Sequence, residues 1–157
     1  MMGGLSKKQI DSIANAVLDS LGKYAAIGKK LETELGWKII LEPPKNNFSN
    51  PLTIHFEHEL SVSLGEHHWH LCTVIGEYES DDLVKLQQLL EQILTEKLII
   101  VSKFQGDKFK LSYSCFNDKI INDKTEKPNF ISKLIGYRPD KIKIRSWNGK
   151  YDREFKI

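Results

Sequence analysis

The feature that most constrains the fold is a stretch in the middle of the chain, residues 51–94, in which two hydrophobic periodicities follow each other. Its first part alternates apolar and polar residues, which is the pattern of strands with one buried face. Its second part, after Ser80, spaces leucine and isoleucine three and four residues apart, as on one face of a helix. This pattern predicts a mixed protein in which a sheet and a helix share an apolar core.

The alternating part divides into three short strands, because one continuous strand would be unusually long. A reversal near Glu59 separates the first two strands. Gly65 then begins a two-residue turn that pairs Leu64 with His67 and, further along, Leu60 with Leu71. The polar face of these strands then carries Ser61, Ser63, His68, His70 and Cys72.

The N-terminal region is predicted to be helical. Ser6 and Gln9 have the spacing of a capping box, in which each residue satisfies a backbone group of the other. Apolar residues keep roughly helical spacing as far as Leu35, with a break expected near Gly22 because glycine weakens a helix interior. Gly36 is placed to end the helix. A short strand is expected next, before two consecutive prolines.

A hairpin is predicted after the leucine-rich helix. Residues 98–104 and 108–116 form its strands, and Gly106 with Asp107 forms the turn. The pairing of Phe104 with Phe109 extends this register. One face then carries Ile100, Ser102, Leu111 and Tyr113.

The last part of the chain is predicted to contain a polar mobile loop, residues 117–128, a helical turn within residues 130–137, and a C-terminal hairpin. Asn148 and Gly149 are typical of a type I′ turn. The register puts Lys143 opposite Glu154 and Arg145 opposite Asp152. The apolar residues gathered on one face are Ile142, Ile144, Tyr151 and Phe155.

Length and element order predict one α+β domain over residues 1–157: an antiparallel sheet with helices packed on it, in the order helix, strands, helix, strands, then a C-terminal hairpin. The formal net charge of +2 is too small to indicate a nucleic-acid partner. No apolar run approaches the ~20 residues of a membrane span, and the N-terminus lacks the apolar core of a signal peptide. We therefore expect a cytoplasmic protein with no nucleic-acid or membrane partner.

All five histidines lie between His55 and His70. His68 and His70 share one side of a strand, and Glu59 on the neighbouring strand completes a candidate set of zinc ligands. The spacing dictates no fourth ligand, and histidines that pair with glutamates on a polar face need no metal. We expect such a polar face, with no metal and no cofactor.

Cys72 lies two residues after His70, the spacing of a nucleophile and base on one face of a strand. A partly buried thiol beside a surface histidine accounts for the same pattern without chemistry. The sequence also lacks a phosphate-binding glycine loop and a serine nucleophile motif. We therefore expect no catalytic residues and no enzyme activity.

The segments LTIHFEHELSVSL, WHLCTVIGEY and SDDLVKLQQLLEQIL give, over about residues 6–116, an order of elements that resembles the class I chaperones of type III secretion systems. The resemblance implies a homodimer that holds an unfolded segment of a secreted effector and performs no chemistry. The leucine-rich helix has a broader apolar face than one sheet contact requires. Its residues expected at the dimer interface are Leu83, Leu86, Leu90 and Ile93.

Two other functions fit the sequence. An immunity protein that binds and neutralises a toxin is also small, cytoplasmic and non-catalytic. A metal-dependent hydrolase would use the histidine cluster from His55 to His70. The partner in the first two hypotheses is another protein, either an effector or a toxin.

Overall fold

The computed structural model describes residues 5–44, 51–57, 59–72, 80–118 and 139–156. Its contacts divide the chain into two compact units, Met1–Glu91 and Gln92–Ile157, where the sequence predicted one domain. Both units contain antiparallel sheets, and helices occur beside the first, so the predicted α+β class is confirmed. Among the described residues, none of the helices has the length and apolarity needed to cross a membrane.

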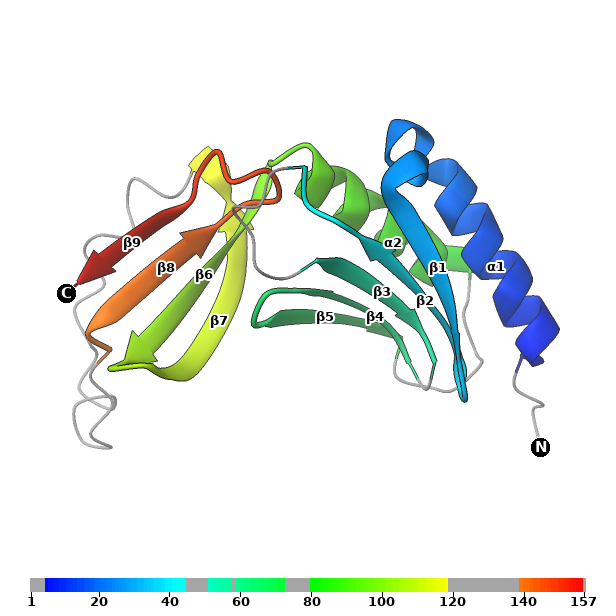
Figure 1. Cartoon of the computed structure of the whole chain (residues 1–157), viewed down its shortest axis with the longest axis horizontal. Coiled ribbons are helices and arrows are strands. Elements are labelled where there is room, and N and C mark those ends of the chain that lie inside the picture. Colours follow the sequence, from blue (N-terminus) through cyan, green and yellow to red (C-terminus); the bar gives the residue numbers. More distant parts are fainter. Residues whose placement is uncertain (1–4, 45–50, 58, 73–79, 119–138, 157) are drawn as a thin grey trace. The chain divides into compact units, whose positions relative to one another are not determined.

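The first unit is built on a five-stranded antiparallel meander in the order β1-β2-β3-β4-β5 (Figure 1). Consecutive strands pair throughout, so β1 and β5 form the two edges of the sheet. The elements of this unit in chain order are α1 (Lys7–Ser20), the 3₁₀-helix η1 (Gly22–Ile27), β1 (Gly28–Thr33), β2 (Gly36–Leu41), β3 (Leu52–Phe56), β4 (Leu60–Leu64), β5 (His67–Cys72) and α2 (Ser80–Leu94).

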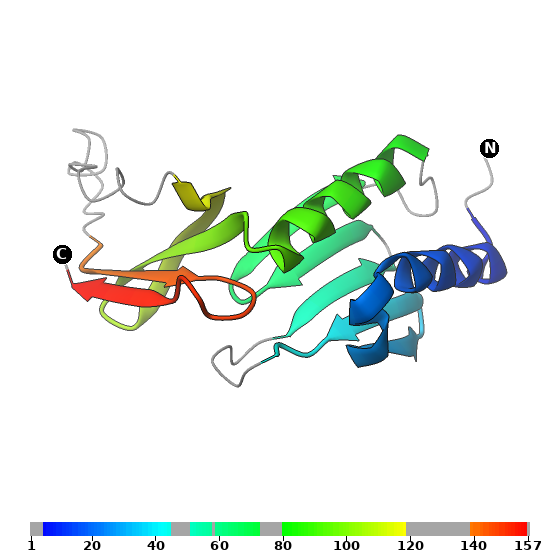
Figure 2. The same ribbon diagram turned by 90° about the horizontal axis from the view of Figure 1, so that it is seen from above.

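Both α-helices lie on the same face of this sheet, as Figure 2 shows. The strands turn alternate apolar side chains toward them, as the sequence predicted for the stretch after residue 51. On β3, β4 and β5 the opposite face is polar. The fully buried core side chains of the strands are Ile39, Leu41, Leu52, Ile54, Phe56, Leu60 and Val62.

The capping box predicted at the start of α1 is confirmed. Ser6 accepts a hydrogen bond from the Gln9 backbone, and the Gln9 side chain accepts one from the Ser6 N–H at 2.9 Å. The expectation that helical structure continues to Leu35 is wrong. Gly22 adopts a left-handed φ of 57° and begins η1, and the chain then forms the β1–β2 hairpin. The apolar residues after Gly22 were too sparse to distinguish a helix from an edge strand.

The register of β4 and β5 confirms two predicted pairs, Leu64 with His67 and Val62 with Trp69. The predicted partner of Leu60 is wrong, because a bulge shifts the register and Leu60 faces Cys72. An extra residue in one strand reverses which side chains lie on which face beyond it. Cys72 is therefore paired with a core residue, whereas His70 is paired with the outward Ser61.

The apolar stripe of α2 is used within the chain. Leu86 and Leu90 are only 0% and 2% exposed, and Ile93 is also buried, so these side chains form no open apolar face. The dimer contact expected at Leu83, Leu86, Leu90 and Ile93 stays a prediction. Leu83 is partly buried, and the exposed large apolar residue on this helix is Val84.

The second unit is a four-stranded antiparallel sheet in the order β7-β6-β8-β9. Its central strand β6 is buried along most of its length. One face packs Ile99, Val101 and Ile144 against partly buried neighbours that include Tyr113 and Phe155. The strands are β6 (Leu98–Gln105), β7 (Lys108–Phe116), β8 (Lys141–Arg145) and β9 (Arg153–Lys156).

The β6–β7 hairpin confirms the turn at Gly106 and the pairing of Phe104 with Phe109. A bulge then shifts the register, so Tyr113 faces Val101 and the predicted shared face with Ile100 is wrong. At both strand bulges, the alternation of apolar and polar residues gives no indication of an extra residue. The predicted mobile loop 117–128 and helical turn 130–137 lie largely or wholly outside the described residues.

The C-terminal hairpin is confirmed, with Lys143 opposite Glu154. Its loop is wider than the predicted two-residue turn, because the last pair of the β8–β9 ladder joins Ile144 and Arg153. Within the loop, the carboxylate of Asp152 accepts a hydrogen bond from the Ser146 N–H at 2.8 Å. Asp152 therefore caps the loop instead of forming the predicted ladder pair with Arg145.

Candidate binding site on the histidine face and the edge of β5

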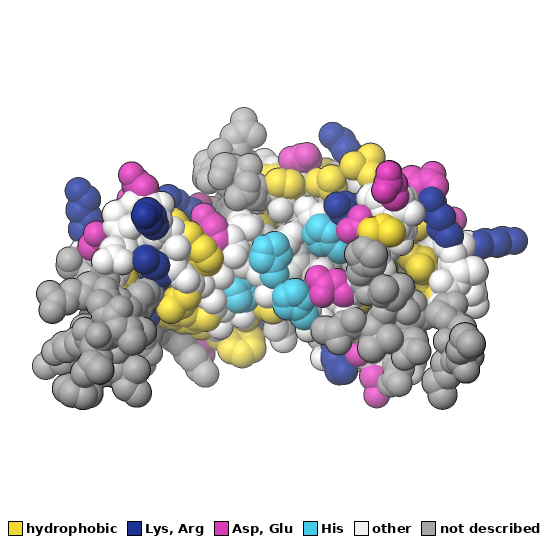
Figure 3. All heavy atoms as spheres, turned by 90° about the horizontal axis from the view of Figure 1, so that it is seen from below, with side chains coloured by type: hydrophobic (Ala, Val, Ile, Leu, Met, Phe, Trp, Pro, Cys, Tyr) yellow, Lys and Arg dark blue, Asp and Glu magenta, His cyan; other side chains and the backbone are white. Residues whose placement is uncertain are grey.

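The polar face of the five-stranded sheet contains three of the five histidines that the sequence singled out, His55, His68 and His70. Strand alternation turns these side chains away from the two helices, and Figure 3 shows the histidines gathered on one face of the molecule. We call this surface the histidine face. It is defined by His55 on β3, Ser61 and Ser63 on β4, and His68 and His70 on β5.

Two cross-strand rows organise this face. In one row His55 lies between Lys38 on β2 and Ser61 on β4, and Ser61 in turn faces His70. In the other row Ser63 faces His68. Directly opposed side chains on a sheet interact, so each histidine has a hydroxyl neighbour.

His55 has the most enclosed position on the histidine face. Its Nε2 lies 3.2 Å from Ser63 Oγ, and its Nδ1 lies 3.6 Å from Glu57 Oε2. Burial lowers the pKa of His55, and the nearby charge of Lys38 lowers it further, against the opposing effect of Glu57. At neutral pH the folded state therefore favours the neutral ring, which can donate or accept hydrogen bonds.

His70 forms the shortest polar contact of the face. Its Nδ1 lies 2.8 Å from Glu59 Oε2, in the turn between β3 and β4. The hydrogen bond from His70 lowers the pKa of Glu59. The predicted metal ligands Glu59 and His70 are thus brought together, but as a hydrogen-bonded pair on an open surface.

His68, the third predicted ligand, faces Ser63 across the ladder. Within the described parts of the chain, no three His, Cys, Asp or Glu side chains are grouped so that they could hold a metal ion. The described residues of the histidine face thus offer hydrogen-bonding groups.

Ser63, His55 and Glu57 lie next to one another in the order of the serine, histidine and acid of a hydrolytic triad. The 3.6 Å separation of His55 and Glu57 is too long for the hydrogen bond that orients a catalytic histidine. Ser63 also lies within a regular ladder opposite Thr53. Its backbone N–H is used by the sheet and is not available to stabilise an oxyanion.

The proposed pairing of Cys72 with His70 is not formed on the histidine face. The bulge places Cys72 opposite Leu60, a core residue, while His70 stays opposite Ser61. Cys72 and Cys115 are both free thiols and are partly buried. The two-residue spacing of His70 and Cys72 therefore does not place a thiol and a base on one face of the sheet.

The backbone of β5 adds a second element to the site. The two-residue turn at Gly65 closes with a hydrogen-bonded pair, Leu64 with His67, so Val62 and Trp69 form the next such pair. The alternate residues, His68 and His70, therefore direct their N–H and C=O groups away from β4, toward the outer edge of the sheet. This orientation was not predicted, although the turn at Gly65 contained the signal for it.

The side chain between these two residues belongs to Trp69, on the opposite side of the strand. Trp69 is partly buried and packs edge-to-face on His67, with ring centroids 4.5 Å apart. The edge of β5 thus alternates two exposed imidazoles on one side with an aromatic surface on the other. This pattern is suited to an extended peptide, whose side chains also alternate.

Comparisons with known proteins found no matching family model, no matching curated protein and no matching solved structure.

Proposed function

We propose that this protein is a non-catalytic chaperone that holds an extended segment of another protein, a secreted effector, by adding it as a strand beside β5. The observation that carries the proposal is the outward direction of the His68 and His70 backbone groups. A peptide placed there gains main-chain hydrogen bonds at both residues. The resemblance of the element order to class I secretion chaperones supports the same function.

The geometry of an added antiparallel strand specifies the peptide. Residues opposite His68 and His70 form hydrogen-bonded pairs, and the residue between them lies opposite Trp69 in the closer type of pair. We therefore expect an apolar side chain opposite Trp69. Acidic or amide side chains suit the two flanking positions, since each imidazole offers a donor on the histidine face.

The test begins with the products of neighbouring genes, each coexpressed with this protein. Limited proteolysis of a complex should protect one segment of the partner without folding it into a compact domain. Hydrogen exchange should slow at the backbone amides of His68 and His70 in the complex, because an added strand bonds them directly. Titration calorimetry should show a large negative heat-capacity change, the signature of coupled ordering and apolar burial.

The decisive variant is His68→Pro. Proline removes an outward N–H but no ladder bond, and edge strands accept it in such positions. His68→Ala is the matched control, because it removes the same imidazole but keeps the outward N–H of β5. We expect His68→Pro to weaken the complex at least ~10-fold and His68→Ala to weaken it much less.

Two results would refute strand addition. Equal binding by the His68→Pro variant is one. The other is a partner that is folded and active alone, is inhibited in the complex, and leaves the His68 and His70 amides exchanging as before. The second result would favour the immunity function and a contact between folded surfaces.

A further inference from the structure

The other edge of the five-stranded sheet, β1, also directs backbone groups outward. Thr33 and Gly36 form the pair that closes the β1–β2 turn, so this pair and Leu31 with Lys38 are hydrogen-bonded. The alternate residues of β1 point away from β2. These residues are Gly28, Lys30 and Glu32.

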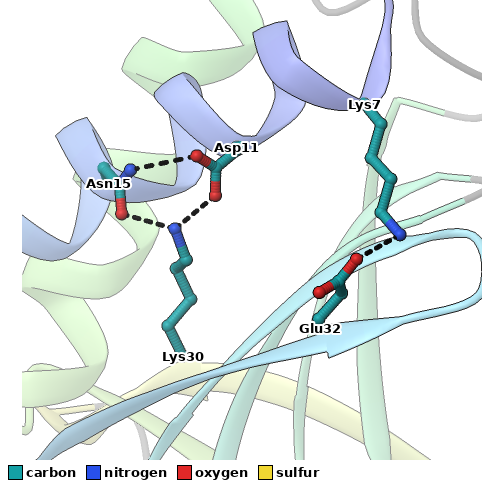
Figure 4. A network of polar contacts seen from close by, with 5 residues as sticks. All are labelled: Lys7, Asp11, Asn15, Lys30 and Glu32. Atoms are coloured by element: carbon teal, nitrogen blue, oxygen red, sulfur yellow. Dashed lines mark hydrogen bonds and ion pairs between the residues drawn. The ribbon is translucent and has the colours of Figure 1, made fainter.

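Edge strands are usually protected by charged side chains; on β1, Lys29 is exposed, whereas Lys30 and Glu32 are engaged by α1. Figure 4 shows Lys30 directed at α1, where its Nζ lies 2.5 Å from both Asp11 Oδ1 and Asn15 Oδ1. Glu32 is likewise paired with Lys7 at 2.5 Å. Both charges therefore lie on the helix-covered side of the strand.

The opposite side of this edge carries three exposed apolar side chains, which alternate with Lys29 and Thr33. Ile27, Leu31 and Leu35 are 39%, 48% and 52% exposed. They make up three of the seven large apolar side chains exposed among the described residues, and they lie at the end of η1, within β1 and in the β1–β2 turn. Exposed apolar side chains beside a strand edge are typical of a pairing surface.

We propose that β1 pairs with β1 of a second copy of this chain, antiparallel and centred on Leu31. In this register Leu31 faces its own counterpart, Ile27 lies by Leu35 of the second copy, and Lys29 faces Thr33. On the other side Lys30 faces Glu32 of the second copy, so opposite charges meet.

The alternative registers are less favourable. Each hydrogen-bonded pair must join two outward residues. The β1 strand of the second copy can therefore be displaced only in steps of two residues. Centring on Lys30 opposes Lys30 to itself and Leu31 to Lys29. Centring on Lys29 or Glu32 also opposes like charges, which destabilises a strand pair. The segment from Ile27 to Leu35 is thus self-complementary in one register.

This pairing joins two five-stranded sheets into one continuous sheet. Because the two-fold axis runs through the Leu31 pair perpendicular to the sheet, both histidine faces lie on the same side. The contact between single strands is small compared with a standard interface of about 800 Å² per partner. We therefore expect a dimer that dissociates in the micromolar range.

Disulfide trapping tests the register in the full chain with Cys72 and Cys115 changed to serine. Leu31→Cys should oxidise to a covalent dimer, because directly opposed residues in the closer type of pair have Cα atoms ~4.5 Å apart. Lys29→Cys alone and Thr33→Cys alone should each form no covalent dimer under the same oxidant. A mixture of the two variants should cross-link. Cross-linking of Lys29→Cys alone, equal to that of Leu31→Cys, would overturn the register.

Sedimentation equilibrium tests the dimer itself without cysteines. Leu31→Lys should raise the dissociation constant at least ~10-fold. It should leave circular dichroism unchanged, because Leu31 is half exposed. Val84→Lys is the control, since Val84 is equally exposed on α2, and it should dimerise normally. A wild type that stays monomeric at tens of micromolar would refute the pairing. It would not affect strand addition at β5, which the His68→Pro variant tests separately.

Discussion

The carboxylate of Glu96 accepts a hydrogen bond from the backbone N–H of Asn148 at 2.7 Å, joining the segment after α2 to the β8–β9 loop. Glu96 is buried and has a left-handed φ of 60°, unusual for a residue with a side chain. Its own N–H donates to the Ile93 carbonyl at 2.9 Å, which ends the helix. Glycine usually occupies such a position, so the Glu96 side chain is present at the cost of backbone strain.

Two variants separate the strain from the hydrogen bond. Glu96→Ala loses the hydrogen bond but keeps the strain, and we expect it to lower the free energy of unfolding by ~1–3 kcal/mol. Glu96→Gly loses the same bond but relieves the strain, so it should be ~1 kcal/mol more stable than Glu96→Ala. Urea unfolding of both variants measures the difference. Equal stabilities would show that the left-handed backbone costs nothing here.

Asp152 lies in the same loop, and its ionisation should make the free energy of unfolding depend on pH. Burial, with a further contribution from the charge of Glu96, raises the pKa of Asp152 above its usual value, against the hydrogen bond from Ser146 and the charge of Arg145. The folded state then favours the protonated form. The contribution of Asp152 to stability is present below its ordinary pKa of 3.8 and is lost as pH rises through the raised pKa.

Asp152→Asn tests this dependence while keeping an oxygen for the Ser146 N–H. We expect the variant to be more stable than wild type at neutral pH, by less than about 1 kcal/mol once solvent screening is considered. The advantage should disappear below about pH 4. Thermal unfolding across this range checks it, and a constant difference would show that Asp152 does not titrate abnormally.

Gly36 should tolerate no side chain. A Cβ built on this residue would lie 2.0 Å from the Phe56 carbonyl oxygen, a backbone atom of the neighbouring strand. We expect Gly36→Ala to cost more than about 2 kcal/mol. Gly106→Ala is the control for a turn glycine, because its left-handed φ of 59° meets open space, so only ~1–2 kcal/mol of backbone strain is expected. A Gly36 variant no worse than the Gly106 variant would contradict the close approach.

The elements predicted correctly from the sequence are those set by interactions between residues close together in the chain. The capping box at Ser6 and the turns at Gly65 and Gly106 depend on residues within a few positions of one another, and each was found. Strands β3 and β4 were predictable because one side of each is fully buried. Strand β1 was missed because both of its sides are partly exposed, which removes the alternation that identifies a strand.

The candidate site was predictable as a face but not as a set of contacts. Alternation placed His68 and His70 on one polar surface, as the structure confirms. The bulge before Cys72 has no signal in the hydrophobic pattern, so the side of the sheet on which this residue lies could not be predicted. The contact of His55 with Ser63 also depends on the β3–β4 register, set by packing across the whole sheet.

The enclosed position of His55 predicts that the protein loses stability in mild acid. Burial lowers the pKa of His55, with Lys38 acting in the same direction, so the folded state favours the neutral ring. The unfolded chain binds a proton first as pH falls below the ordinary value of 6.5, and stability therefore decreases from that pH down to the lowered pKa. The charged and titratable groups around the ring are Lys38, Glu57 and His68.

His55→Gln keeps a group that can hydrogen-bond Ser63 but does not titrate. We expect wild type to lose more unfolding free energy than this variant between about pH 7.5 and about pH 5. Thr53→Ala is the matched control, because Thr53 lies on the same face of β3 and has no titratable group, so it should leave the wild-type pH dependence in place. Urea unfolding at the two pH values gives the comparison. If His55→Gln loses as much stability as wild type, the acid sensitivity comes from another group and the buried ring is not its cause.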